Sequence, residues 1–226
     1  GIYLGPARVG RTQTRIVREG SRAIRIESTT RLSPGATQAV AALTGRDEPV
    51  VMKFNAEIAP LRGLQTIHVD VEALNVRLDG RMEDDMMKLT GKVGGQKIRE
   101  SLRMGANPVV GSTFSPVSSV SDITEANIGQ SWEIAVVQPL TGQVQRVSVT
   151  PVASAMVPVK LGEAAEPERV FKLSFRLDET TWTAWVRADG EPLIQQLPPP
   201  LPLVLRREDI NKQALEELTL GDTPAE

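Results

Sequence analysis

The chain has 226 residues, of which 40% are hydrophobic and 24% are charged, and its formal net charge at pH 7 is −2. This composition is ordinary for a globular protein with a sizeable core, and it supplies no strong positive field for nucleic acid or an anionic membrane. The absence of cysteine excludes disulfides and thiol chemistry, and no run of about 18 apolar residues predicts a membrane span. Because the sequence begins with Gly1 and not with Met, we expect a longer native chain with its own N-terminus.

Alternating apolar and polar residues predict β-strands throughout the first half of the chain. Gly94-Gly95 and Asp79-Gly80 are typical of hairpin turns. The alternation slips by one residue at Leu74, which predicts a β-bulge inside a long strand. The strands predicted here cover residues 8–18, 22–32, 50–59, 64–78, 86–93 and 97–104.

The second half begins with an irregular segment, residues 105–129, which is a candidate lid over the sheet. Within it, Ser121 to Glu125 predicts a capped helical turn. Residues 180–209 predict a strand, a tight turn at Asp189-Gly190, a returning strand and a third extended segment. Further strands are predicted over residues 132–137, 143–150 (continued by 152–161) and 170–177, and a short amphipathic helix over residues 209–218.

Ten or more strands joined by short turns predict an all-β, mainly antiparallel fold. We expect a long curved meander sheet that forms a half-barrel or a barrel, with one or two short helices. Residues 1–218 are predicted to form a single β domain, and residues 219–226 a C-terminal tail or linker.

One group of side chains resembles a metal site. His68, Asp70 and Glu72 alternate on one face of a predicted strand, and such ligands suit Zn or Mn in a metal-dependent hydrolase. However, alternate residues lie about 7 Å apart on a strand, and a solvated strand face gives the same pattern. No Gly-x-Ser-x-Gly and no phosphate-binding glycine motif occurs. We therefore predict no catalytic residue, no metal, no cofactor and no enzymatic activity.

Methionines gather around one predicted hairpin, and methionine-rich apolar surface adapts to varied ligands. An apolar ligand such as a lipid is one interpretation of this cluster, and ordinary core packing is the other. The candidate ligand-binding residues are Met52, Phe54, Met87, Met104, Phe114 and Trp182. The proline-rich stretch from Leu197 to Leu203 is interpreted as a segment that prevents a sheet edge from pairing with other chains, or as a polyproline ligand for a protein partner.

Three short motifs carry a family resemblance: Trp132 to Gly142, Trp185 to Leu193 and Leu203 to Ala214. They resemble turns of uncharacterised bacterial periplasmic β-domains, including domains that precede transglutaminase-like domains and have a shape similar to the half-barrels of lipoprotein carriers. The chain departs from them at Gln138, where Asp is usual.

The resemblance implies a non-catalytic module of the periplasm or cell envelope. Such a module would bind an apolar ligand or peptide in a concave sheet face, or position a neighbouring domain. A transglutaminase-like enzyme needs a cysteine, so any such domain would follow Glu226. A purely structural interaction domain is the alternative.

Overall fold

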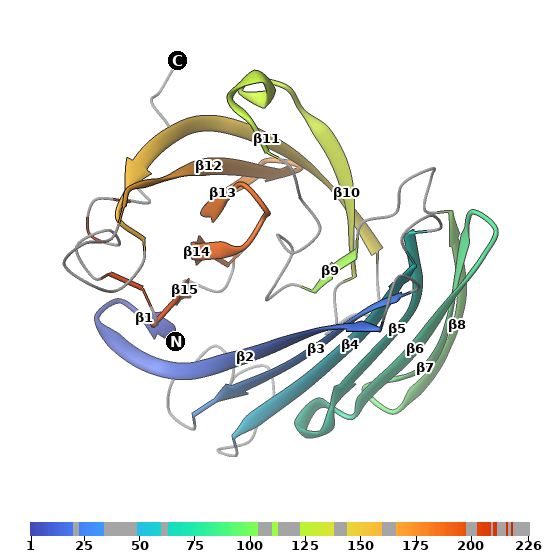
Figure 1. The fold of residues 1–226 in the computed structure, drawn as a ribbon. Coiled ribbons are helices and arrows are strands. Elements are labelled where there is room, and N and C mark those ends of the chain that lie inside the picture. Colours follow the sequence, from blue (N-terminus) through green and yellow to red (C-terminus); the bar gives the residue numbers. More distant parts are fainter. Residues whose placement is uncertain are drawn as a thin grey trace. The chain divides into compact units, whose positions relative to one another are not determined.

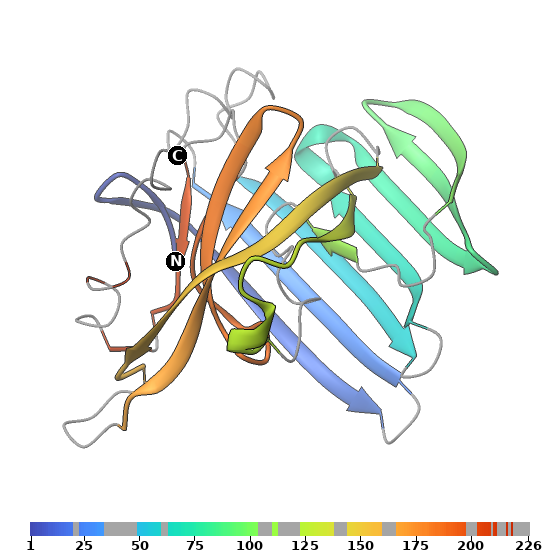
Figure 2. The same ribbon diagram turned by 90° about the horizontal axis from the view of Figure 1, so that it is seen from above.

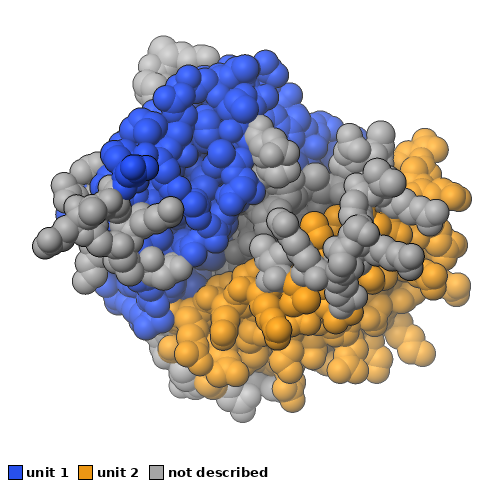
Figure 3. Space-filling model, viewed as in Figure 1, with its two compact units in different colours: residues 1–8, 115–134, 146–226 blue, residues 9–114, 135–145 orange. Residues whose placement is uncertain are grey.

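The computed structural model describes residues 1–19, 23–33, 49–59, 63–103, 110–112, 123–137, 144–159, 166–197, 203–208, 210–211, 216 and 218. The chain divides into two compact units, which are described one at a time (Figure 3). Unit 1 comprises residues 1–8, 115–134 and 146–226, and unit 2 comprises residues 9–114 and 135–145. The expectation of a single domain over residues 1–218 stays a prediction.

The described residues form fifteen strands and two short 3₁₀ turns (Figure 1). In chain order they are β1 (Ile2–Leu4), β2 (Ala7–Glu19), β3 (Ala23–Leu32), β4 (Val50–Ala59), β5 (Gly63–Val71), η1 (Glu72–Leu74), β6 (Val76–Glu83), β7 (Met86–Val93), β8 (Gln96–Arg103), β9 (Val110–Ser112), η3 (Glu125–Asn127), β10 (Trp132–Val137), β11 (Val144–Val157), β12 (Glu168–Leu177), β13 (Thr180–Arg187), β14 (Pro192–Gln196) and β15 (Val204–Arg206). None of the described helical segments is long and apolar enough to cross a membrane.

Unit 2 is an antiparallel meander in the order β8-β7-β6-β5-β4-β3-β2 (Figures 1 and 2). Alternation along each strand separates a buried apolar face from an exposed polar face. The apolar face is buried over β4 to β7, and its buried side chains include Met52, Phe54, Leu78, Met87 and Leu89. On β8, Ile98 of the same face is only half-buried. The short strand β9 pairs parallel with β10, so the fold is mainly but not wholly antiparallel.

Unit 1 contains a second meander, in the order β1-β15-β14-β13-β12-β11. Trp182 lies opposite Phe175, and their rings stack with centroids 5.5 Å apart. Trp185 faces the other way and packs with Val157 and Ile194. The two tryptophans therefore occupy opposite faces of β13, as their spacing predicts.

The all-β, mainly antiparallel meander predicted from the alternation is confirmed. In unit 2, β8 and β2 do not pair, and in unit 1, β1 and β11 do not pair, so neither described meander closes into a barrel. Of the two expected shapes, the closed barrel is therefore not observed.

Two predicted features of unit 2 are wrong. The slip in alternation at Leu74 is a chain reversal and not a bulge, because η1 and a left-handed Asn75 (φ 51°) connect β5 to β6. Gly80 lies inside β6 and not in a turn. The position requires glycine because a Cβ there would approach Cγ1 of Ile67 to 2.5 Å. The glycine makes room for packed side chains, whereas the turn falls at Asp84 (φ 56°).

Other turns agree with the sequence. The Gly94-Gly95 hairpin is confirmed, and so is the turn at Asp189-Gly190, where Gly190 N donates to Arg187 O at 2.9 Å. The capped turn of the irregular segment is η3, whose capping box joins Thr124 and Asn127, so it lies slightly later than predicted. Most of residues 105–122 and of the helix predicted over residues 209–218 lie outside the described residues.

Candidate functional site

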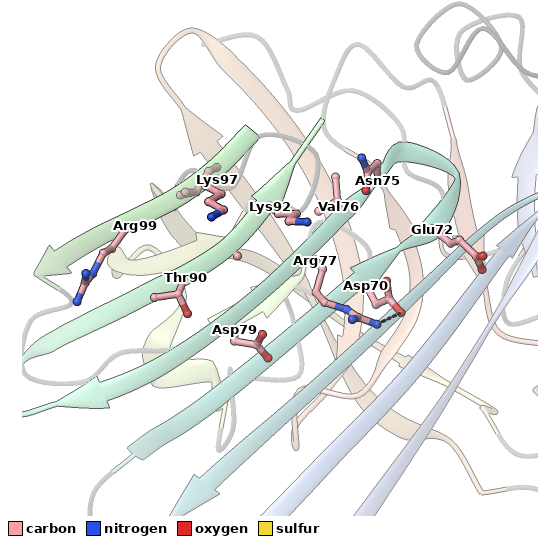
Figure 4. Close-up of a pocket in the computed structure, with 12 residues that line it drawn as sticks. Asp70, Glu72, Asn75, Val76, Arg77, Asp79, Thr90, Lys92, Lys97 and Arg99 are labelled. Carbon is pink, nitrogen blue, oxygen red and sulfur yellow. Dashed lines mark ion pairs between the residues drawn. The ribbon is translucent and has the colours of Figure 1, made fainter. Parts of the chain in front are cut away.

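An open groove of about 810 Å³ lies in unit 2, over β5, η1, β6, β7 and β8 (Figure 4). Nine of its twelve lining residues are polar or charged, in contrast to the apolar face of the same strands. The lining residues are Asp70, Glu72, Asn75, Val76, Arg77, Asp79, Thr90, Gly91, Lys92, Lys97, Ile98 and Arg99.

Strand register brings the charged side chains of the groove together. One row across four neighbouring strands consists of Asp70, Arg77, Lys92 and Lys97, each directly opposite the next. Residues directly opposite each other in antiparallel strands have Cβ atoms about 4.5–5.5 Å apart. The row therefore places three cationic side chains side by side, with one carboxylate at its β5 end.

The next row of the same face consists of His68, Asp79, Thr90 and Arg99. Nδ1 of His68 lies 2.7 Å from Oδ1 of Asp79. In the first row, Nη2 of Arg77 lies 3.9 Å from Oδ2 of Asp70. These two acids are therefore already partnered within the protein.

We call Lys92, Lys97 and Arg99 the cationic corner. All three side chains are exposed, and no ion pair or hydrogen bond joins any of them to another described residue. Two cationic side chains beyond the groove do form ion pairs: Nε of Arg103 lies 2.8 Å from Oδ2 of Asp85, and Lys88 pairs with Glu83. The hydrogen bond from Lys88 holds the pKa of the Glu83 carboxyl below its ordinary value.

The residues considered for a metal site have other roles. His68 and Asp70 face Asp79 and Arg77, and Glu72 belongs to η1, beyond the end of β5. Across the described parts of the chain, no group of three His, Asp or Glu side chains is placed to hold one ion. These contacts give the metal-dependent hydrolase no support.

The four described members of the predicted apolar-ligand set are not among the residues that line the groove. Met52, Phe54 and Met87 are buried in the core of unit 2, and Trp182 is buried in unit 1. Met104 and Phe114 lie outside the described residues. The assignment of these six residues to a ligand site stays a prediction.

The alternation along single strands does not predict the cationic corner, although the sequence contains a signal for it. A two-residue Gly94-Gly95 turn fixes the pairing of the flanking strands, so that Lys92 must oppose Lys97. Reading side chains across the predicted hairpin, and not only along each strand, predicts this pair.

Comparison with protein-family models, with curated proteins and with solved structures finds no match for this chain.

Proposed function

We propose that the chain is a non-catalytic binding module that takes an anionic ligand at the cationic corner of unit 2. The observation that carries this proposal is the direct opposition of Lys92 and Lys97, with Arg99 beside them and no described acid paired with any of the three. Opposed like charges destabilise a sheet by about 0.2–1 kcal/mol, so a protein gains nothing in stability from this arrangement.

A carboxylate or phosphate at the corner removes that repulsion. Each ammonium or guanidinium group donates charge-assisted hydrogen bonds, which are about twice as strong as neutral ones. The planar guanidinium of Arg99 can bind an anion in bidentate fashion, while the lysines act as adaptable point charges. The groove around the corner is open, which suits reversible binding better than chemistry that requires the exclusion of water.

Citrate is the probe that tests this proposal, by isothermal titration calorimetry at low ionic strength. We expect saturable binding that weakens about tenfold or more in a Lys92→Ala/Lys97→Ala variant, because two charge-assisted hydrogen bonds are lost. Arg15→Ala is the matched control, since Arg15 is an exposed cation on β2, at the other end of the unit 2 meander. Absence of binding, or equal weakening in the control, contradicts the proposal.

An apolar ligand is the second candidate, and one observation in unit 1 favours it. Trp182 and Gln195 are 4% and 1% exposed, yet Nε1 of Trp182 and both amide atoms of Gln195 lack a hydrogen-bond partner among the described residues. Gln195 opposes Ala184, two residues from Trp182, so both side chains share one face of the sheet. A ligand with an apolar body and an uncharged polar group fits such surroundings.

Tryptophan fluorescence with 1-octanol as the probe tests the second candidate. In a Trp132→Phe/Trp185→Phe protein, Trp182 is the remaining tryptophan, and its emission should shift saturably with octanol. Gln195→Leu should abolish the shift. An unchanged emission spectrum would leave the candidate without support.

The cell-envelope location belongs to the same proposal and is supported by the three motifs that resemble periplasmic domains. Fractionation of cells that express the full-length gene tests it, and recovery in the cytoplasmic fraction contradicts it. If neither citrate nor octanol binds, the purely structural interaction domain becomes the better account.

A further inference from the structure

β8 is the last strand of the unit 2 meander. It pairs with β7 along its whole length, from Gln96 opposite Val93 to Arg103 opposite Met86, and with no other strand in the part of the chain that the structure describes. The outer edge of such a strand presents backbone N–H and C=O groups that can pair with an added strand.

The side chains of β8 are unequal on its two faces. Lys97, Arg99, Ser101 and Arg103 alternate on the polar face that bears the groove. Arg103 is paired with Asp85, whereas Lys97 and Arg99 belong to the cationic corner. Lys97 and Arg99 are about 6.6–6.8 Å apart along the strand, which is the spacing of alternate side chains on any β-strand.

Charge decides which strand can occupy this edge. A second copy of β8, placed antiparallel with the same face up, brings Arg99 opposite Arg99 or Lys97 opposite Arg103. Both arrangements set like charges directly against each other and are destabilising. A strand with acidic residues at alternate positions instead sets a carboxylate opposite Lys97 and another opposite Arg99.

We propose that β8 binds an extended acidic peptide segment as an added strand, with acidic residues at positions i and i+2 facing Lys97 and Arg99. This inference rests on the proposed function, because it uses the same cationic corner and names the class of its anionic ligand. Backbone hydrogen bonds to β8 supply affinity, and the alternating carboxylates supply selectivity. The competing explanation is that the charges only prevent edge-to-edge aggregation.

Four labelled peptides of eight residues, of three kinds, test this proposal by fluorescence anisotropy. The first alternates Glu and Val. The second has the same composition but places its glutamates in adjacent positions, which divides them between the two faces of a strand. The third repeats the first with N-methyl groups on alternate backbone amides, which removes donors from one edge; both N-methylation registers are made.

The alternating peptide should bind at least about tenfold more tightly than the second peptide and than the N-methylated form that blocks the paired edge. Lys97→Glu/Arg99→Glu should abolish binding, while Arg15→Glu leaves it unchanged. Both variants are checked for folding by circular dichroism. In hydrogen exchange, the alternating peptide should protect amides of β8 that exchange freely in the free protein, whereas citrate should not.

The outcomes separate the two proposals. If all peptides bind equally, citrate competes with them and β8 amides gain no protection, the anion site stands and strand addition is overturned. If the peptides bind equally well to Lys97→Glu/Arg99→Glu and citrate does not bind at all, the proposed function fails as well. Absence of peptide binding alongside intact citrate binding overturns only the strand addition.

Discussion

Lys92 of β7 lies directly opposite Lys97 of β8 in the antiparallel pairing of unit 2. The two-residue turn at Gly94-Gly95 allows no other pairing between these strands. Neither ammonium group forms an ion pair with a described acid, in contrast to Lys88, which pairs with Glu83. The pair is therefore a local cost to stability, which the proposed anionic ligand would offset.

That cost is measurable in the free protein. Lys97→Gln should raise the free energy of unfolding by about 0.2–1 kcal/mol, because it removes one of two opposed like charges. Urea denaturation at low salt measures the change, and added salt should reduce it by screening. Arg15→Gln serves as the control and should have a smaller effect. A loss of stability in Lys97→Gln would show that the lysine has a stabilising contact in the folded protein.

Gly80→Ala should destabilise the protein by about 1–3 kcal/mol through overpacking. An added Cβ would lie 2.5 Å from Cγ1 of Ile67, 2.8 Å from Sδ of Met87 and 2.9 Å from Cδ2 of Leu89, all of which are core side chains. The neighbouring Arg81→Ala, on the exposed face, should change stability by less than about 0.5 kcal/mol. Equal midpoints of thermal unfolding for the two variants would contradict the tight packing around Gly80.

Alternation predicts the strands because it reports which face is buried, and it does so well for β4 and β12. It does not do so for β13, where five consecutive residues are buried. It does not distinguish the reversal at Asn75 from a bulge, because both shift the apolar pattern by one residue. Asp79-Gly80 wrongly predicts a turn for a related reason: a glycine required by close packing and a glycine required by a turn look alike in sequence. The lack of a hydrogen-bond partner for the buried Gln195 amide depends on side chains from several strands, and no local sequence pattern predicts it.

The Glu83 carboxyl should titrate below its ordinary range, chiefly because Lys88 donates a hydrogen bond to it and also because the charges of Lys88 and Arg81 favour its ionised form. Lys88→Met should raise the pKa of Glu83, as followed by ¹³C NMR of its side-chain carboxyl. Lys53→Met, on the exposed face of β4, is the control.

The same shift sets a pH dependence of stability. A carboxyl whose pKa is lower in the folded state stabilises the protein above its unfolded-state pKa, and this contribution is lost as the pH falls through the folded-state value. The difference in unfolding free energy between the wild type and Lys88→Met should therefore shrink on acidification. A difference that stays constant with pH would mean that the Lys88–Glu83 pair does not perturb Glu83.

Gln195→Leu should stabilise the ligand-free protein by about 1–3 kcal/mol, because it removes a buried amide that has no described partner. The neighbouring Gln196 provides a matched control, since its Oε1 accepts hydrogen bonds from N and Oγ1 of Thr183 at 3.2 and 3.3 Å. Gln196→Leu should therefore destabilise the protein by about 0.5–1.5 kcal/mol. Chemical denaturation of both variants measures the contrast. If Gln195→Leu instead destabilises the protein as Gln196→Leu does, the Gln195 amide is satisfied in the folded state and gives no support to a ligand beside Trp182.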